Sequence, residues 1–178
     1  MKDNNQELLP LVDEEGRVIG SATRGECHDG SKLLHPVVHL HVFDSAGRLY
    51  LQQRPLWKDI QPGKWDTAVG GHVSYGEHLL EALYRESSEE LGFSEFNPIH
   101  IVTYEFESEV EKELINVYAA VGHYELTPDP EELDGGQWWE LPTPRSHSDN
   151  PQQRCCWDRN RSDPYCRIQT DSASHWTL

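Results

Sequence analysis

The sequence is poor in the features of membrane, secreted and nucleic-acid-binding proteins. No apolar run approaches the roughly 20 residues of a membrane span, and the first residues, MKDNNQELLPLVDEEG, lack the apolar core of a signal peptide. Basic residues are scarce, since 15 Lys and Arg face 31 Asp and Glu and the net charge is −16. This acidity excludes broad binding to nucleic acid polymers or anionic membranes. We therefore expect a cytoplasmic protein.

Regularly spaced cysteines and internal repeats are also missing. The four cysteines match no disulfide framework and no zinc-ligand spacing. A chain of 178 residues with 36% hydrophobic residues predicts one domain, which we assign to residues 1–144. Residues 145–178 hold five arginines, four aspartates and almost no apolar periodicity. We expect this segment to be an atypical, disordered tail without a catalytic role.

Short apolar segments separated by turn residues predict β-strands. They are residues 8–12, 17–22, 37–43, 49–54, 65–69, 101–106, 114–121 and 137–141. The turn at 44–47 predicts a hairpin between residues 37–43 and 49–54, and the segments 101–106 and 114–121 predict a second hairpin. Because these strands flank a central helical segment, we expect an α/β fold with a mixed central sheet and helices on its faces.

The segment after residue 73 predicts one amphipathic helix that is rich in acid. Ser74 and Glu77 form an S-x-x-E capping box, so we expect the helix to begin between them. A mostly apolar stripe would dock this helix on the sheet. The stripe consists of Leu79, Leu80, Leu83, Ser87 and Leu91.

The same helix carries a cluster of carboxylates. Glu86, Glu89 and Glu90 lie on adjoining faces within about one turn. Such groups repel one another unless a cation lies among them, and hard oxygen ligands suit Mg²⁺ or Mn²⁺. Arg85 can hold a carboxylate in place through its fork of donors. An ordinary solvated acidic face is the alternative, but the glycine loop before the helix and the complete spacing favour a metal site.

The stretch from Gly71 to Phe93, GHVSYGEHLLEALYRESSEELGF, resembles the Nudix box of the MutT-like hydrolases. Its charged and glycine positions are all filled, by Gly71, Glu77, Arg85, Glu86, Glu89, Glu90 and Gly92. Ser87 departs from the family, which usually has an aliphatic residue there. The resemblance implies a Nudix-type α/β/α sandwich and substitution at a phosphorus of a diphosphate.

The resemblance also implies roles for these residues. Mg²⁺ or Mn²⁺ is the implied cofactor, and its implied ligands are the Gly71 carbonyl, Glu77, Glu86, Glu89 and Glu90. Glu77 is either a ligand or an orienting residue, and Arg85 fixes a glutamate. The general base is either a box glutamate or a residue of a later loop, where Glu111 and Glu113 are candidates. Their segment, EFESEVEKE, is equally typical of a solvated hairpin tip.

Residues 17–121 are also similar to type I isopentenyl-diphosphate isomerase. In that family two histidines precede the first long strand, a third follows a tryptophan-containing strand, and a Glu-x-Glu pair comes later. The matching positions are His28, His35, His72, Glu111 and Glu113. The resemblance implies a second site for a divalent transition metal. Each of these residues alone is equally explained as an ordinary core or surface group.

The similarity to the isomerase breaks at the acid that protonates the alkene. The family has a cysteine immediately before the Gly-His of the loop, and this chain has Gly70 there. Cys27 lies beside His28, elsewhere in the pattern, and is not assumed to replace it. Because the hydrolase carboxylates are complete, we expect a Mg²⁺-dependent Nudix hydrolase. Its expected substrate is a nucleoside diphosphate linked to another moiety, or a related organic diphosphate.

Two other functions stay open: an isopentenyl-diphosphate isomerase-like enzyme and a catalytically idle nucleotide-binding module. A small-molecule diphosphate is the expected partner, and a homodimer is compatible with the sequence. Arg54 and Lys58 are candidate phosphate contacts, and tryptophan side chains are candidates for stacking on a base. The tryptophans are Trp57, Trp138 and Trp139. Each of the five is better explained as a core or surface residue than as a substrate contact.

Overall fold

The computed structural model describes residues 4–58 and 62–141, so the predicted tail at 145–178 lies outside the described residues. Within them the strands are β1 (Leu8–Val12), β2 (Val18–Thr23), β3 (Leu34–Phe43), β4 (Leu49–Gln53), β5 (Trp65–Asp66), β6 (Val69–His72), β7 (Ile99–Glu107), β8 (Lys112–Val121) and β9 (Gly136–Trp139). The helices are α1 (Arg24–Cys27) and α2 (Leu79–Leu91).

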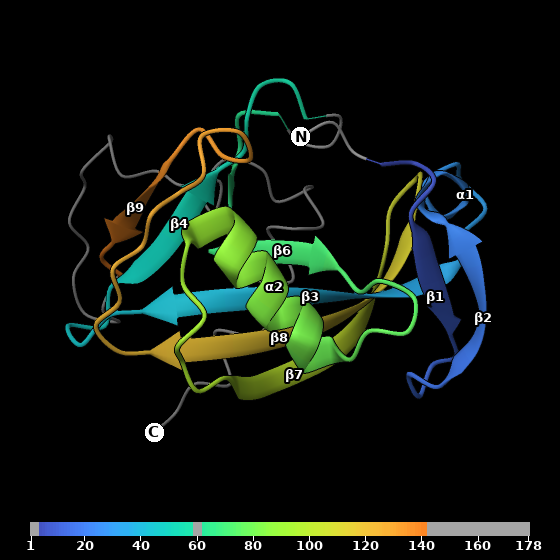
Figure 1. Cartoon of the computed structure of the whole chain (residues 1–178), viewed down its shortest axis with the longest axis horizontal. Coiled ribbons are helices and arrows are strands. Elements are labelled where there is room, and N and C mark those ends of the chain that lie inside the picture. The colour runs from blue at the N-terminus through green and yellow to red at the C-terminus, as the bar shows by residue number, and fades with distance from the viewer. Residues whose placement is uncertain (1–3, 59–61, 142–178) are drawn as a thin grey trace. The chain divides into compact units, whose positions relative to one another are not determined.

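The strands form one large mixed sheet and one small ribbon. The large sheet runs β5-β4-β3-β8-β7, with β6 paired to β3 and β9 paired to β4. β3 and β8 are parallel along their whole length, whereas the other pairs in this sheet are antiparallel. β1 and β2 form a separate two-stranded sheet beside α1 (Figure 1). The predicted α/β fold with a mixed central sheet is confirmed.

The predicted pairing of strands is only partly correct. β7 and β8 form the second expected hairpin. The first hairpin is short, since β3 and β4 pair only at Val42 with Tyr50 and at Phe43 with Leu49. The rest of β3 pairs with β6 and β8 instead. The single strand predicted at 65–69 is wrong, because its first two residues pair with β4 and its last begins β6 on β3.

Helix α2 begins later than the sequence predicts. Ser74 and Glu77 do contact each other, since the Ser74 N–H donates to the Glu77 carboxylate at 3.0 Å, but they form a turn before the helix. The helix begins at Leu79, and the Glu81 carboxylate accepts a hydrogen bond of 2.9 Å from the His78 N–H. Glu77 therefore lies in the loop before the helix.

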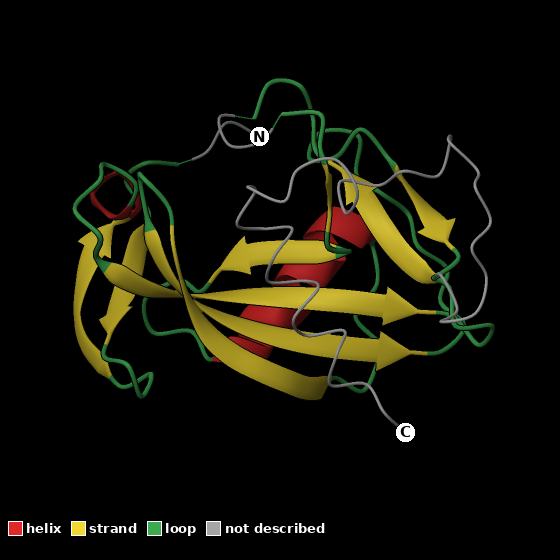
Figure 2. Cartoon of the chain, turned by 180° about the vertical axis from the view of Figure 1, so that it is seen from behind, coloured by secondary structure: helices red, strands yellow, loops and turns green. Residues whose placement is uncertain are grey.

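α2 lies across one face of the large sheet, and Figure 2 shows it behind the strands from the opposite side. Its buried residues are Ala82, Leu83, Ser87 and Leu91. Leu80, predicted in the buried stripe, is 45% exposed, so that assignment is wrong. Ser87 is accommodated in the core because its hydroxyl donates to the Leu83 carbonyl at 2.7 Å, which satisfies the polar group locally.

The alternation of side chains along β3 separates the apolar core from a polar face. Val38, Leu40 and Val42 are buried in the core cluster that contains the apolar side of α2. His35, His39 and His41 are the alternate residues and therefore point to the other face. Among the described residues, no helix has the length and apolar character needed to cross a membrane.

Replacing Leu83 by Ala should destabilise the fold by about 2–5 kcal/mol, because it opens a cavity under α2. Leu80→Ala, on the exposed side of the same helix, should change the free energy of unfolding by about 0.5 kcal/mol or less. Urea denaturation of both variants measures the difference. Equal losses would mean that α2 packs on the sheet through the predicted stripe after all.

Candidate functional site

Arg85 is the centre of the acidic cluster. Its Nε and Nη2 donate to the two oxygens of the Glu77 carboxylate at 2.9 Å each. Its Nη1 donates to Glu86 at 2.8 Å and to Glu89 at 3.1 Å. Nη2 also donates to the backbone carbonyl of His72 at 3.0 Å. One guanidinium therefore joins the loop before α2, the helix itself and the end of β6.

Glu77 orients this guanidinium. Partial burial would raise the pKa of its carboxyl, but the hydrogen bonds from Arg85 and from the Ser74 N–H outweigh burial and lower the pKa. Both carboxylate oxygens are occupied by the Arg85 fork. In this arrangement Glu77 holds Arg85, and the other glutamates keep oxygens available for a cation.

Glu86 lies directly against the glycine loop. A Cβ added to Gly71 would overlap the Glu86 carboxylate, so the close approach depends on glycine. Burial raises the pKa of Glu86 to about 7, although Arg85 opposes the change. A carboxyl held this way is costly to ionise unless a further positive charge is present.

Glu90 faces the same loop from one turn further along α2. The backbone N–H of Gly70 and the side-chain amide of Gln52 donate to its Oε2 at 3.3 and 3.4 Å. Burial, with the nearby Glu86 carboxyl second, raises the pKa of Glu90 well above its ordinary value. Glu89 differs from both, because its side chain is 56% exposed.

This group of carboxyls fits a hard divalent cation. Glu86 and Glu90 are half-buried against the glycine loop and burial raises the pKa of both carboxyls, which is unlike a solvated helix face. A cation among these oxygens would offset both the desolvation and the mutual repulsion. Glu86 approaches Gly71, Glu90 accepts from the Gly70 N–H, and Glu89 is joined to Glu86 through Nη1 of Arg85. Oxygen-only ligands suit Mg²⁺ or Mn²⁺.

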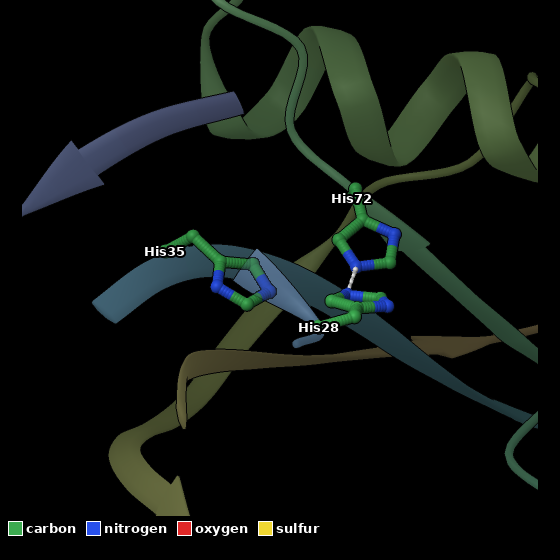
Figure 3. A group of neighbouring side chains, drawn as sticks. All are labelled: His28, His35 and His72. Carbon is green, nitrogen blue, oxygen red and sulfur yellow. Dashed lines mark hydrogen bonds between the residues drawn. The ribbon is translucent and has the colours of Figure 1, made fainter. Parts of the chain in front are cut away.

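A second cluster contains the three predicted histidines (Figure 3). His28 ends α1, His35 begins β3 and His72 ends β6. One nitrogen from each ring lies within 4.8 Å of the other two. The Nε2 atoms of His28 and His72 are 3.0 Å apart and share a hydrogen bond. Segments 44 residues apart in the sequence therefore bring their imidazoles together.

Glu111 and Glu113 border this cluster and are not a solvated hairpin tip. They are only 3% and 6% exposed. Strand register places Glu113 beside His35, and Glu111 Oε2 lies 3.5 Å from His28 Nε2. Burial raises the pKa of both carboxyls, that of Glu113 to about 8. The five residues predicted for a second metal site thus lie together.

Two atoms of this second cluster have unmet bonding capacity. Within residues 4–58 and 62–141, His35 Nε2 and Glu113 Oε2 are buried and have no hydrogen-bond partner. Buried polar atoms are nearly always paired. An imidazole nitrogen and a carboxylate oxygen that both lack partners fit a borderline divalent metal.

The residues weighed for substrate contact make mostly internal contacts. Arg54 pairs with Asp66 at 3.1 Å, and Lys58 pairs with Glu132 at 3.2 Å. Trp138 packs edge-on against Tyr50, and Trp139 against Trp65, with ring centroids 5.3 Å apart in both pairs. Trp57 is half-exposed, with the ammonium of Lys58 4.8 Å from its ring.

Cys27 does not reach the site. Its side chain is fully buried with Leu9 and Ala22 in the small core of the ribbon. Burial also raises the pKa of its thiol to about 11, so the group is inert.

Arg24 is a site residue that the sequence did not reveal. Its Nη1 lies 3.1 Å from Nδ1 of His72, 48 residues further along the chain. Arg24 belongs to no motif, and only the docking of α1 beside the end of β6 creates the contact. The ring of His39 lies beside Gly70, where an added Cβ would contact it at 3.5 Å.

Comparisons with known proteins show what this chain is similar to. The family model described as NUDIX domain matches residues 33–155. An isopentenyl-diphosphate Delta-isomerase of Burkholderia multivorans is 38% identical over 144 residues, which cover 78% of this chain and 80% of the relative. The isopentenyl-diphosphate Delta-isomerase of Clavibacter sepedonicus is 33% identical over 139 residues, which cover 74% of this chain and 73% of the relative. An uncharacterized Nudix hydrolase of Yersinia pestis is 33% identical over 132 residues, covering 74% and 72%.

Solved structures share the fold. DR0079 from Deinococcus radiodurans superposes with a TM-score of 0.65 at 27% identity, covering 75% of this chain and 83% of its own. The MutT protein from Methanosarcina mazei superposes with a TM-score of 0.55 at 24% identity, covering 61% and 78%.

Replacing Gly71 by Ala should weaken Mn²⁺ binding about 10-fold or more, because the new methyl group displaces the Glu86 carboxylate. Gly70→Ala is the matched control, since its methyl group would meet His39 at an ordinary contact distance. Calorimetric titration with Mn²⁺ compares the two. Equal affinities would exclude the glycine loop from the site.

Glu86 should also make the metal-free chain sensitive to pH. Its pKa is raised to about 7 from 4.5, so its contribution to stability is present below pH 4.5 and is lost as the pH rises through 7. Glu86→Gln should therefore gain about 3 kcal/mol relative to the wild type between pH 5 and 8. Urea denaturation in EDTA measures this gain. A difference that stays constant with pH would contradict the raised pKa.

Proposed function

The chain belongs to the Nudix family, and from that premise we propose that it is a divalent-cation-dependent hydrolase of an organic diphosphate. The substrate we propose is a nucleoside diphosphate linked to another moiety, or a related diphosphate ester. The observation that carries this proposal is the placement of Glu86 and Glu90 against the Gly70–Gly71 loop, with Arg85 joining Glu86 to Glu89.

The glutamates of this cluster differ in exposure, and we assign their proposed roles accordingly. A divalent cation held by Gly71, Glu86, Glu89 and Glu90 would polarise a phosphoryl oxygen, lower the pKa of water and stabilise the leaving group. Glu89 is the exposed carboxylate of the set, so we assign it to accept the proton of the attacking water and pass it to solvent. Arg85 keeps this carboxylate in place through Nη1.

The overall charge of the chain does not attract such a substrate. At −16 the net charge repels a diphosphate. The cation and nearby guanidinium and ammonium groups must therefore supply the local attraction. Arg54 and Lys58 are the candidates, and binding would require each to exchange its present carboxylate partner for phosphate.

An isomerase acting on isopentenyl diphosphate is the second candidate. It is favoured by the assembled set of His28, His35, His72, Glu111 and Glu113, and by relatives that carry that name. Gly70 argues against it, because a glycine offers no acid to an alkene. An idle nucleotide-binding module is disfavoured, since pure binding has no need of three clustered carboxylates.

Phosphorus NMR of a mixed substrate panel with Mg²⁺ or Mn²⁺ tests the proposal. The panel contains nucleoside di- and triphosphates, sugar and dinucleotide diphosphates, and isopentenyl diphosphate. We expect new monophosphate signals from one diphosphate class. Proton NMR of isopentenyl diphosphate showing a migrated double bond, with the diphosphate intact, would overturn the proposal in favour of the isomerase.

Replacing Glu89 by Gln should lower kcat about 100-fold or more while the fold stays intact, because the charge is lost from an exposed position. Glu95→Gln is the control, since Glu95 is an exposed glutamate just beyond α2. Steady-state kinetics and thermal unfolding of both variants measure the effects. Unchanged turnover in Glu89→Gln would remove this carboxylate from the chemistry.

A further inference from the structure

The contact between Arg24 and His72 restricts what the histidine cluster can bind. A guanidinium has donors and no acceptor. Because Arg24 Nη1 lies 3.1 Å from His72 Nδ1, Nδ1 must be the acceptor. The ring then carries its proton on Nε2, which lies 3.0 Å from His28 Nε2 and donates to it. The three residues form a chain of hydrogen bonds that uses both nitrogens of His72.

This chain leaves His72 without an atom for a metal. If Nδ1 were the ligand, its lone pair would be taken by Arg24. If Nε2 were the ligand, the ring proton would have to move to Nδ1, and an N–H cannot accept from a guanidinium. A ring that accepted at both nitrogens would have lost both of its protons. Metal-bound histidines instead donate their second N–H to an acceptor, which Arg24 is not.

We infer that Arg24 and a metal ion are mutually exclusive partners of the His28, His35 and His72 cluster, so that Arg24 must leave His72 before the metal is bound. Arg24 is then a positioning residue that sets the metal affinity of the cluster. The inference rests on the metal role of this cluster and is independent of the hydrolase activity proposed for α2.

The ionisable groups around the cluster respond to Arg24 as they would to a metal cation. Glu111 and Glu113 are buried at the cluster, and Arg24 is a positive charge that favours their ionised forms. On His35 and His72, Arg24 favours the neutral ring, because it lowers the pKa of both imidazoles in addition to the effect of burial. A divalent ion would shift the pKa of the same groups in the same direction.

Titration of the full-length chain with Co²⁺ tests the inference, because visible absorption bands of Co²⁺ report imidazole ligation and need no turnover. Excess Mg²⁺ keeps the carboxylates of α2 occupied. Arg24→Gln should bind Co²⁺ about 10-fold more tightly or better, the worth of one charge-assisted hydrogen bond. The glutamine amide oxygen can accept from Nδ1–H, as metal-bound histidine requires. Arg24→Lys, which keeps a charged donor, should resemble the wild type.

Arg54→Gln is the control for charge alone. Arg54 also acts electrostatically on Glu111 and Glu113 and pairs with Asp66, so its loss should tighten binding less than the loss of Arg24. Equal gains in Arg54→Gln and Arg24→Gln, or no gain in Arg24→Gln, would overturn the inference. Absence of imidazole bands in the wild type and in Arg24→Gln would overturn the metal role itself, leaving the hydrolase proposal intact.

Nitrogen NMR of the wild type supplies a second measurement that needs no variant. Long-range proton–nitrogen spectra distinguish a ring nitrogen that carries a proton from one that accepts. We expect His72 Nδ1 to be unprotonated in the metal-free chain and to change its state when Zn²⁺ is added. A His72 Nδ1 that carries a proton before Zn²⁺ is added would contradict the hydrogen-bond chain.

Discussion

The structure depends on the placement of one guanidinium. Arg85 spans the loop that carries Glu77, the helix that carries Glu86 and Glu89, and the backbone of His72 in β6. Arginine suits this position because its planar fork donates in several directions and stays charged. Without it, the half-buried Glu86 carboxyl would lose a hydrogen-bonded positive charge, and the His72 carbonyl would lose its hydrogen bond from α2.

Strand β6 contacts two groups of side chains that differ chemically. Its residues pair with β3, so neighbouring side chains point to opposite faces. Gly71 faces the Glu86 carboxylate of α2, and the backbone N–H of Gly70 donates to Glu90. His72 points to the other face, where imidazoles gather. The carboxylates and the imidazoles thus gather at different positions along a strand that is four residues long.

The absence of side chains at two positions decides the chemistry as much as the charged groups do. Gly71 admits the Glu86 carboxylate to the backbone, which a larger residue would prevent. Gly70 leaves the space beside His39 open and supplies no acid. Two relatives named isomerase are 33% and 38% identical to this chain, while the proposed hydrolase role rests on the retained glutamates.

The sequence alone determined the fold class and the acidic helix, because spacing in a motif and alternation in strands are local properties. The five residues at the histidine cluster were implied by the resemblance to the isomerase family. The sequence pattern misplaced the helix start and Leu80, since the choice of cap and of buried face depends on what the helix packs against. Only the tertiary structure decided that Glu111 and Glu113 are buried beside His28 and His35. It alone revealed Arg24 at His72, because contacts between distant segments arise from strand pairing and docking, which no local pattern encodes.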